Sequence, residues 1–253
     1  MIGQLSHAWL SGQLARAWGN ELLWPADPHE EVALGAQQHD IGWARFDLEP
    51  RFNPETGLPC NFLELTVEEH LAIWRSAPAR MLSQSLHAAL VVSLHGSSLS
   101  ELRARSAPEQ AEGLRGHIEE ERARQEELRA ALGLSEEQTQ LMQRQMWTWD
   151  GISLALCMAW RPFTAHDVPA RSGPIDIELR DLADGTATLD PWPFAAARVE
   201  VRCEGRQLDA RYHDAAAVRE ALANARPRTL SFILRAAGHG AARVRRARVK
   251  ASA

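Results

Sequence analysis

The adjacent pair His39-Asp40 is the part of this sequence whose residue types most directly suggest chemistry. It follows the apolar residues 32–34 and precedes Gly42, a pattern that predicts a buried helix ended by a glycine. Neighbouring residues on a helix project about 100° apart, so this imidazole and carboxylate can both reach one ion. Together they are ligand types that zinc, iron, manganese and nickel accept in proteins.

Two isolated polar residues elsewhere in the chain fit the same chemistry. Asp150 is the only charged residue between positions 145 and 160, a stretch that is apolar nearly all round and predicts a buried helix. A lone buried carboxylate needs a cation or a metal ion. His7 follows Ser6, a predicted N-cap, and opens a helix over 7–18 whose leucine stripe directs the imidazole into the core. We therefore interpret both side chains as metal ligands.

Two further histidines extend the set. His70 lies on a helix opened by a capping box that begins at Thr66, and His95 lies in a long uncharged stretch that predicts a second buried helix. His87 shares that helix and is interpreted as structural, the usual role of a lone helical histidine. The remaining histidines, in polar or loop-like sequence, are given no role: His29, His117, His166, His213 and His239.

The order His7, His39-Asp40, Asp150 resembles the HD-domain superfamily of metal-dependent phosphohydrolases. With His70 and His95, the order is similar to the longer pattern of two-metal members, among them cyclic-nucleotide phosphodiesterases and di-iron oxygenases related to myo-inositol oxygenase. In more detail, nearly the whole chain resembles a bacterial family of unknown function. That similarity is carried by Trp43 and by the segments 53–59, 92–95 and 191–194.

The resemblance implies a dinuclear metal site. His7, His39, Asp40 and Asp150 would hold the first ion, and Asp40, the catalytic carboxylate, would bridge to a second ion held by His70 and His95. The ions would be divalent Mn, Fe, Ni, Mg or Zn, and they would lower the pKa of a bound water toward ~7. The substrate would be a small phosphorylated or nucleotide-like compound.

Two other functions remain open from the sequence. The same ligands could hold two irons in an HD-type oxygenase, or a non-catalytic protein could keep the HD fold to bind or sense a ligand. Cleavage of cyclic dinucleotides is not expected, because no Gly-Tyr-Pro motif follows and His95 precedes a glycine.

The sequence patterns around these residues predict a mainly α fold with a small C-terminal antiparallel β-sheet. Residues 1–165 are predicted to form an HD-type helical metal-binding domain, in which 101–134 is a charged helical insert. The loop 46–65 follows the His39-Asp40 pair directly and should border the site. Trp43 and Phe52 are predicted to contact substrate, and Asp47 is a further candidate.

After Pro169 the hydrophobic period changes from helical to alternating, which predicts a β subdomain over 166–240. One hairpin is expected from 175–179 and 186–189, joined by a turn at 183–185. A second hairpin is expected from 199–203 and 208–212 around the turn Glu204-Gly205. A helix near 214–223 and a strand at 229–234 follow. This subdomain could cap the site or form a homodimer interface, and residues 241–253 form a basic tail expected to be flexible.

Composition excludes several other classes of function. The only lysine among the 253 residues is Lys250, so the chain has neither a Walker A loop nor a Schiff-base lysine in its body. A net charge of −5 argues against broad nucleic-acid binding. Three scattered cysteines indicate a reducing cytoplasm. The sequence shows neither a signal peptide nor an apolar run of ~20 residues, so a membrane protein is not expected. The expected partner is a small-molecule substrate.

Overall fold

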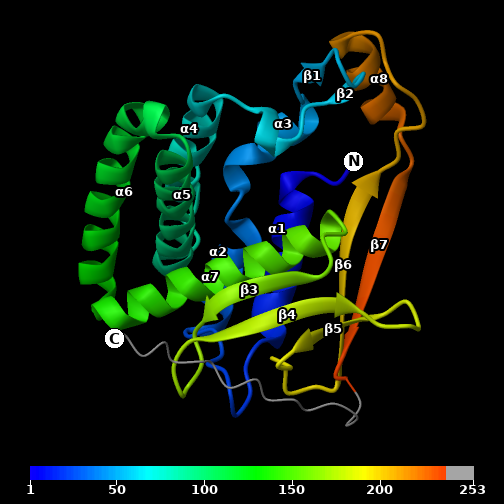
Figure 1. Ribbon diagram of the computed structural model, residues 1–253. Helices are drawn as coiled ribbons and strands as arrows, with labels where there is room; N and C mark the ends of the chain where they lie inside the picture. The colour runs from blue at the N-terminus through cyan, green and yellow to red at the C-terminus, as the bar shows by residue number, and fades with distance from the viewer. Residues whose placement is uncertain (238–253) are drawn as a thin grey trace, which may run out of the picture.

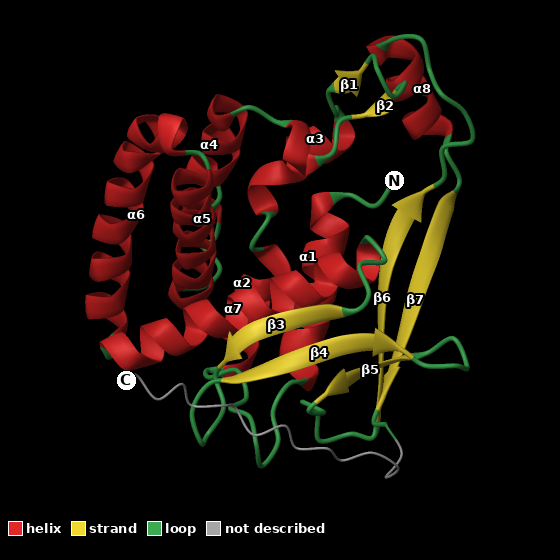
Figure 2. Ribbon diagram, viewed as in Figure 1, coloured by secondary structure: helices red, strands yellow, loops and turns green. Residues whose placement is uncertain are grey.

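Seven helices precede a five-stranded sheet in this chain (Figures 1 and 2). The computed structural model describes residues 1–237. The helices of the first part are α1 (Gln4–Ala17), α2 (His29–Gln38), α3 (Ala44–Leu48), α4 (Val67–Ser76), α5 (Leu86–Ser106), α6 (Ala111–Leu132) and α7 (Glu136–Cys157). Short 3₁₀ turns lie at Ile41–Trp43, Phe62–Glu64, Pro78–Arg80 and Pro108–Gln110. The predicted helical character of residues 1–165 is confirmed for these elements.

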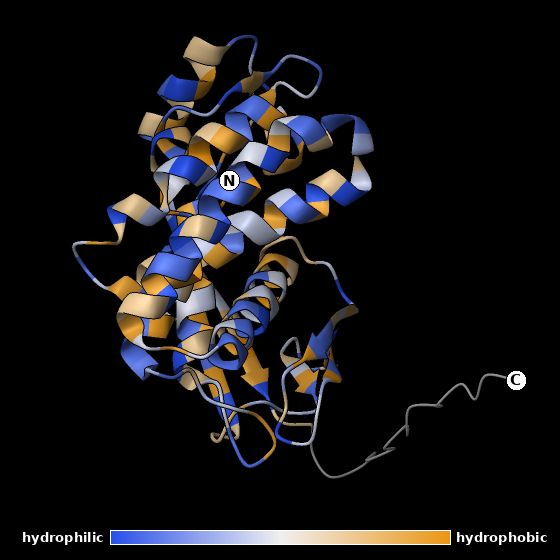
Figure 3. Cartoon of the chain, turned by 90° about the vertical axis from the view of Figure 1, so that its left-hand side faces the viewer, coloured by the Kyte–Doolittle hydropathy of each residue, from blue (hydrophilic) through white to orange (hydrophobic). Residues whose placement is uncertain are grey.

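Helices α1, α2, α5 and α7 contact one another and form the centre of the helical part. Their inward residues include Leu10, Leu90 and Trp149, all fully buried. Burial of such side chains is worth roughly 1.5–3 kcal/mol each. In Figure 3 the helical ribbons change between hydrophilic and hydrophobic colours within a turn, as amphipathic helices do. The N-cap of α1 is Gly3 and not the predicted Ser6, so the helix starts one turn earlier than expected.

The predicted charged insert is a helical hairpin made by the end of α5 and by α6, which lie side by side in Figure 1. Pro108 begins the 3₁₀ turn that connects the two helices. The hairpin is less solvated than its composition suggests, because α6 buries Leu114, His117, Glu121 and Leu128 against its neighbours.

The sheet has the strand order β3-β4-β5-β7-β6. Its strands are β3 (Phe163–Val168), β4 (Ile175–Asp181), β5 (Ala187–Asp190), β6 (Arg198–Arg206) and β7 (Pro227–Arg235), and α8 (Ala215–Asn224) precedes the last of them. All neighbours are antiparallel except β5 and β7, which pair in parallel. The chain is therefore mixed α/β with a mixed sheet, which corrects the expectation of a mainly α fold with an antiparallel sheet.

The first predicted hairpin, β4–β5, is confirmed, whereas the second is wrong. Strand β6 continues through Glu204-Gly205 to Arg206, and its partner is β7, which follows 20 residues later. The physical reason is that the chain start runs beside this segment: Ile2 bridges Gly205, and the Arg206 amide donates to the Met1 carbonyl at 2.8 Å. A glycine in a strand commonly marks such a close backbone approach and need not mark a turn.

The segment after α2 is tightly folded and is not an open loop. It contains α3, the two-residue strands β1 (Phe52–Asn53) and β2 (Leu58–Pro59), and a 3₁₀ turn capped by Asn61. Gly42 lies in a 3₁₀ turn and does not terminate α2, which ends at Gln38. A Cβ atom at Gly42 would lie 2.2 Å from the backbone oxygen of Ile73. This turn can therefore approach α4 only because the residue is glycine.

One hydrophobic cluster joins the helices to the sheet. It includes Leu14 of α1, Ile152 of α7, Ile177 of β4, Val201 of β6 and Leu234 of β7. The predicted domain boundary at 165 falls inside β3, whose neighbour in the helical part is α7. Over the described residues, no helix combines the length and apolarity that crossing a bilayer requires. The predicted basic tail, 241–253, lies outside the described residues.

Candidate metal centre

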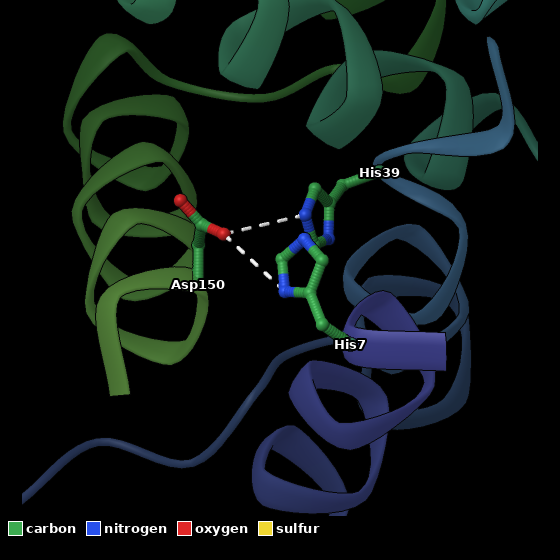
Figure 4. A group of neighbouring side chains, drawn as sticks. All are labelled: His7, His39 and Asp150. Atoms are coloured by element: carbon green, nitrogen blue, oxygen red, sulfur yellow. Dashed lines mark ion pairs between the residues drawn. The ribbon is translucent and has the colours of Figure 1, made fainter. Parts of the chain in front are cut away.

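Five of the six predicted metal ligands meet at the centre of the helical part. His7 comes from α1, His95 from α5 and Asp150 from α7, while His39 and Asp40 follow the last residue of α2. Each is buried, and none exposes more than 7% of its surface. Figure 4 shows His7, His39 and Asp150 pointing toward one another from three separate segments.

The distances within this cluster suit ligands that share a cation. The Oδ1 atom of Asp150 lies 3.4 Å from Nε2 of His39 and 3.8 Å from Nδ1 of His7. The Oδ2 atom of Asp40 lies 2.8 Å from Nε2 of His7 and 3.5 Å from Nε2 of His39. Two groups have ligand atoms within 4.8 Å of one another: His7, His39 and Asp150, and His39, Asp40 and His95. These residues could hold a metal ion.

The hydrogen bonds around His7 and His39 determine which nitrogen faces the carboxylates. Nδ1 of His39 donates to the Ala36 carbonyl at 2.8 Å. Its Nε2 has no hydrogen-bond partner among residues 1–237 and points into the cluster. Ser153 donates to the backbone oxygen of Asp150 and accepts from Ser11, which leaves it an acceptor for Nδ1 of His7 at 2.8 Å.

Each imidazole is therefore held by its Nδ1–H and presents Nε2 to a carboxylate. Two neutral imidazoles would place lone pairs against two negative charges, an arrangement that only protons or a cation can stabilise. An imidazole whose other nitrogen is fixed by a protein acceptor is the usual form of a metal-bound histidine. The residues present thus fit a divalent metal ion.

The charges of the cluster shift the pKa values of its members in opposite directions. Burial disfavours the charged form of His39, but Asp40 and Asp150 outweigh this effect and raise its pKa to about 9. Burial likewise opposes ionisation of Asp150, yet the nearby histidines, His39 first, hold the pKa of that carboxyl below its usual value. Burial and the charge of His39 lower the pKa of His95 to about 4, so His95 is neutral at pH 7.

His70, the sixth predicted ligand, is not part of either group. Its Nδ1 is hydrogen-bonded to Nη1 of Arg103, and its ring stacks on Trp74 with centroids 4.8 Å apart. Burial and then the charge of Arg103 lower the pKa of His70 to about 4. The neutral ring therefore accepts a hydrogen bond from the guanidinium and does not present that nitrogen to an ion.

A cavity of about 330 Å³ adjoins the cluster. Its lining includes His7, Asp40, His95 and Asp150 of the cluster, together with His70 and Arg103. The predicted contact Trp43 lines this cavity, whereas the predicted contact Phe52 does not; Phe62 lines it instead. Phe52 lies in β1 opposite Pro59. The carboxylate of Asp47 accepts from the amides of Gln4 and Leu5 at 2.9 Å, so it caps α1.

Comparison with known proteins gives a family for the chain. The family model described as "Protein of unknown function (DUF3891)" matches residues 1–210. The chain belongs to the DUF3891 family. No curated protein and no solved structure matches it. The expected similarity to a family of unknown function is confirmed, while this match establishes no link to the HD-domain superfamily.

The DUF3891 match covers every residue of the cluster and of the adjoining cavity. It ends in the segment between β6 and α8, so β7, the partner of β6, lies beyond it. The part of the chain that the family defines therefore includes the whole candidate metal centre.

Three residues of this DUF3891 site were not identified from the sequence. Ser11 lies four residues after His7, and Ser153 lies three residues after Asp150, so each is one helical turn from a ligand on the same face. That spacing was a usable signal. No sequence signal distinguished Arg103, because it lies among charged residues, as any arginine on an exposed helix does.

Proposed function

We propose that this protein is an HD-type metal-dependent phosphohydrolase acting on a small phosphorylated or nucleotide-like compound. The observation that carries the proposal is the buried meeting of His7, His39, Asp40 and Asp150, in which imidazole Nε2 atoms face carboxylate oxygens beside a cavity. The order of these residues, which resembles the HD superfamily, supports the same assignment.

His7, His39, Asp40 and Asp150 would hold the ion, with His95 completing the set. A divalent ion supplies a bound water of lowered pKa and positive charge beside phosphoryl oxygens. The chain contributes the rest: Ser153 and the Ala36 carbonyl orient the two imidazoles, and the buried helices exclude bulk water. Trp43, which is 4% exposed, forms an apolar wall for the substrate.

The proposal is limited to one ion per chain. His39 belongs to both groups, yet only its Nε2 is available, so the two groups cannot each take an ion through it. The second ion predicted from the sequence would need His70, whose Nδ1 is hydrogen-bonded to Arg103. We therefore expect close to one tightly held ion in protein purified without an affinity tag.

The test is phosphate release from a panel of phosphomonoesters and nucleotides by protein loaded with Mn²⁺, Ni²⁺ or Mg²⁺. We expect metal-dependent release that Asp150→Ala abolishes, together with at least a tenfold loss of metal affinity in that variant. The control is Asp176→Asn, which removes an exposed carboxylate of β4 that is paired with His166. It should keep both properties.

Three outcomes would contradict the proposal. Metal binding by Asp150→Ala equal to that of the wild type would remove Asp150 from the ligand set. Turnover that requires iron and consumes oxygen would identify an oxygenase. Tight metal binding with no turnover of phosphoesters or oxygenase substrates would favour a sensing protein.

A further inference from the structure

Arg103 is a guanidinium held in place entirely by neutral groups. It is half-buried near the end of α5. Its Nε donates to Oε1 of Gln110 at 2.9 Å, its Nη2 donates to the Leu65 carbonyl at 3.3 Å, and its Nη1 is hydrogen-bonded to Nδ1 of His70. Three contacts fix the direction of the side chain, and none of them offsets its positive charge.

The charge of Arg103 has no ion-pair partner in the part of the chain that the structure describes, although exposed Glu68 on α4 is close enough to interact with it. Arg51, Arg75 and Arg105, which lie nearby in sequence or on adjoining segments, each pair with a glutamate. Among residues 1–237 no carboxylate forms an ion pair with Arg103, and the sequence after 237 contains no Asp or Glu. Because Arg103 is half-buried, it loses part of its hydration without an ion pair in return, so an anion from outside the chain is a suitable partner.

The position of Arg103 indicates where that anion would come from. Arg103 lines the same cavity as Asp40, His95 and Asp150. A guanidinium has five N–H donors, of which three are used, so two remain for an oxyanion. Arg103 follows His95 by eight residues on α5, about 12 Å of helix. The two positions are therefore far enough apart to face different ends of one molecule in the cavity.

We propose that Arg103 is an anion-binding residue of the cavity, and that the substrate carries a phosphate or carboxylate group in addition to the bond cleaved at the metal centre. That the anion belongs to a substrate, and that a bond is cleaved at the metal centre, rests on the proposed function; the anion site at Arg103 does not. His70 positions the guanidinium through Nδ1, and Trp43 and Trp74 lie against the His70 ring, with centroids at 5.7 and 4.8 Å. An apolar segment of the ligand lies between its two polar ends.

The test is calorimetric titration with inorganic phosphate and, separately, with acetate, using both Mn²⁺-loaded protein and protein treated with EDTA. Without metal the cluster has no divalent cation to attract an anion and keeps the two carboxylates of Asp40 and Asp150, so we assign anion binding that persists to a site elsewhere. We expect the tighter of the two anions to lose at least tenfold in affinity in Arg103→Met. Arg103→Lys should fall between, because lysine keeps the charge but not the two-pronged donor geometry. The matched control is Arg105→Met, an exposed arginine two residues away on the same helix, and it should bind as the wild type does.

A crystal soaked in tungstate, a phosphate analogue, gives an independent measurement. We expect an anomalous peak at the Arg103 guanidinium. The proposal is overturned if neither anion binds the metal-free wild type, if Arg103→Met binds as tightly as the wild type, or if tungstate lies only at exposed arginines. Mn²⁺ affinity should be unchanged in Arg103→Met. Absence of phosphoester turnover in the wild type would contradict the proposed function and leave these titrations to decide the anion site separately.

Discussion

Ser153 determines that Nδ1 is a protonated nitrogen of the His7 ring. Its single hydroxyl proton goes to the backbone of Asp150, so it can only accept from Nδ1 of His7. Ser153 lies on α7, as Asp150 does. The hydrogen bond between Ser153 and His7 therefore links the orientation of the imidazole on α1 to the helix that carries the Asp150 carboxylate. Partners of this kind typically affect metal affinity although they do not touch the metal.

Replacing Ser153 by alanine should therefore weaken metal binding by roughly 10–100-fold, since His7 loses the acceptor that fixes its Nδ1–H. Titration calorimetry with Mn²⁺ measures the change. Ser98→Ala removes a serine of α5 that bonds only Leu94 and Gln143, and it should bind Mn²⁺ within a factor of two of the wild type. Equal affinities for the Ser153→Ala and Ser98→Ala variants would contradict a role for Ser153 at the cluster.

Metal affinity should also rise with pH. In the metal-free protein the carboxylates raise the pKa of His39 from 6.5 to about 9, so a metal ion must displace a proton from it at neutral pH. We expect the apparent Ni²⁺ affinity to increase about tenfold per pH unit from pH 6 to 8, with about one proton released per ion. Calorimetry in two buffers of different ionisation heat counts that proton.

The raised pKa of His39 also predicts how the stability of the metal-free protein changes with pH. A raised pKa means that protonated His39 stabilises the metal-free fold below pH 6.5, and that this contribution is lost as the pH rises through about 9. Metal-free protein should thus lose stability over that interval while metal-loaded protein does not. Identical pH profiles with and without metal would show that His39 does not exchange its proton for the ion.

At the scale of elements, the α5–α6 hairpin is held by a buried polar network and not only by apolar contacts. Glu121, 1% exposed, accepts from Ser93 at 2.6 Å and from Arg124 at 3.2 Å. His117, also buried, bonds Ser100 at 2.8 Å. The sequence predicts only a charged helical insert here, because these residues lie among charged neighbours and only tertiary contact distinguishes a buried glutamate from an exposed one.

Glu121→Ala should destabilise the protein by about 1–3 kcal/mol, because Ser93 and the Arg124 charge lose their buried partner. The adjacent Glu120 pairs with Arg75 at 3.0 Å on the surface, where such a pair contributes about 0–1 kcal/mol. Urea unfolding of Glu121→Ala and Glu120→Ala measures the contrast. Equal unfolding free energies for the two variants would show that the network does not hold the hairpin.

Local patterns predicted the helices and the β4–β5 hairpin well, because both depend on residues close in sequence. They failed for β6 and β7, whose pairing joins segments separated by α8. For the same reason residue type and order predicted that His7, His39, Asp40, His95 and Asp150 come together, but they did not predict the hydrogen bond between His70 and Arg103. That hydrogen bond joins side chains of α4 and α5 that are 33 residues apart in the sequence, and no local pattern predicts their contact.

At the scale of the whole molecule, the helices and the sheet share one core. Leu14, Ile177, Leu179, Val201 and Leu234 are fully buried in the same cluster although they come from both parts of the chain. Helix α1, which carries His7, contacts β6, and α7, which carries Asp150, contacts β3. The sheet therefore supports two of the helices that position the candidate metal ligands.

A fragment ending at residue 165, the predicted domain boundary, should consequently fail to form a native core. It would expose the apolar faces that β4, β5, β6 and β7 cover, so we expect dye binding to exposed apolar surface and no near-ultraviolet circular dichroism. The full chain, treated identically, is the control. A fragment with a native-like near-ultraviolet spectrum and cooperative unfolding would show that the helical part is an independent domain.

The close approach of Gly42 to the Ile73 carbonyl has a consequence for how relatives of this protein diverge. Because any Cβ at that position meets backbone, selection for the fold alone is expected to retain the glycine. Under the proposed function, selection on Asp40 and Asp150 depends instead on whether the ion is still used. A relative that keeps the glycine but has lost both aspartates would then have kept the fold without the proposed chemistry, so the three positions together would separate active from inactive relatives.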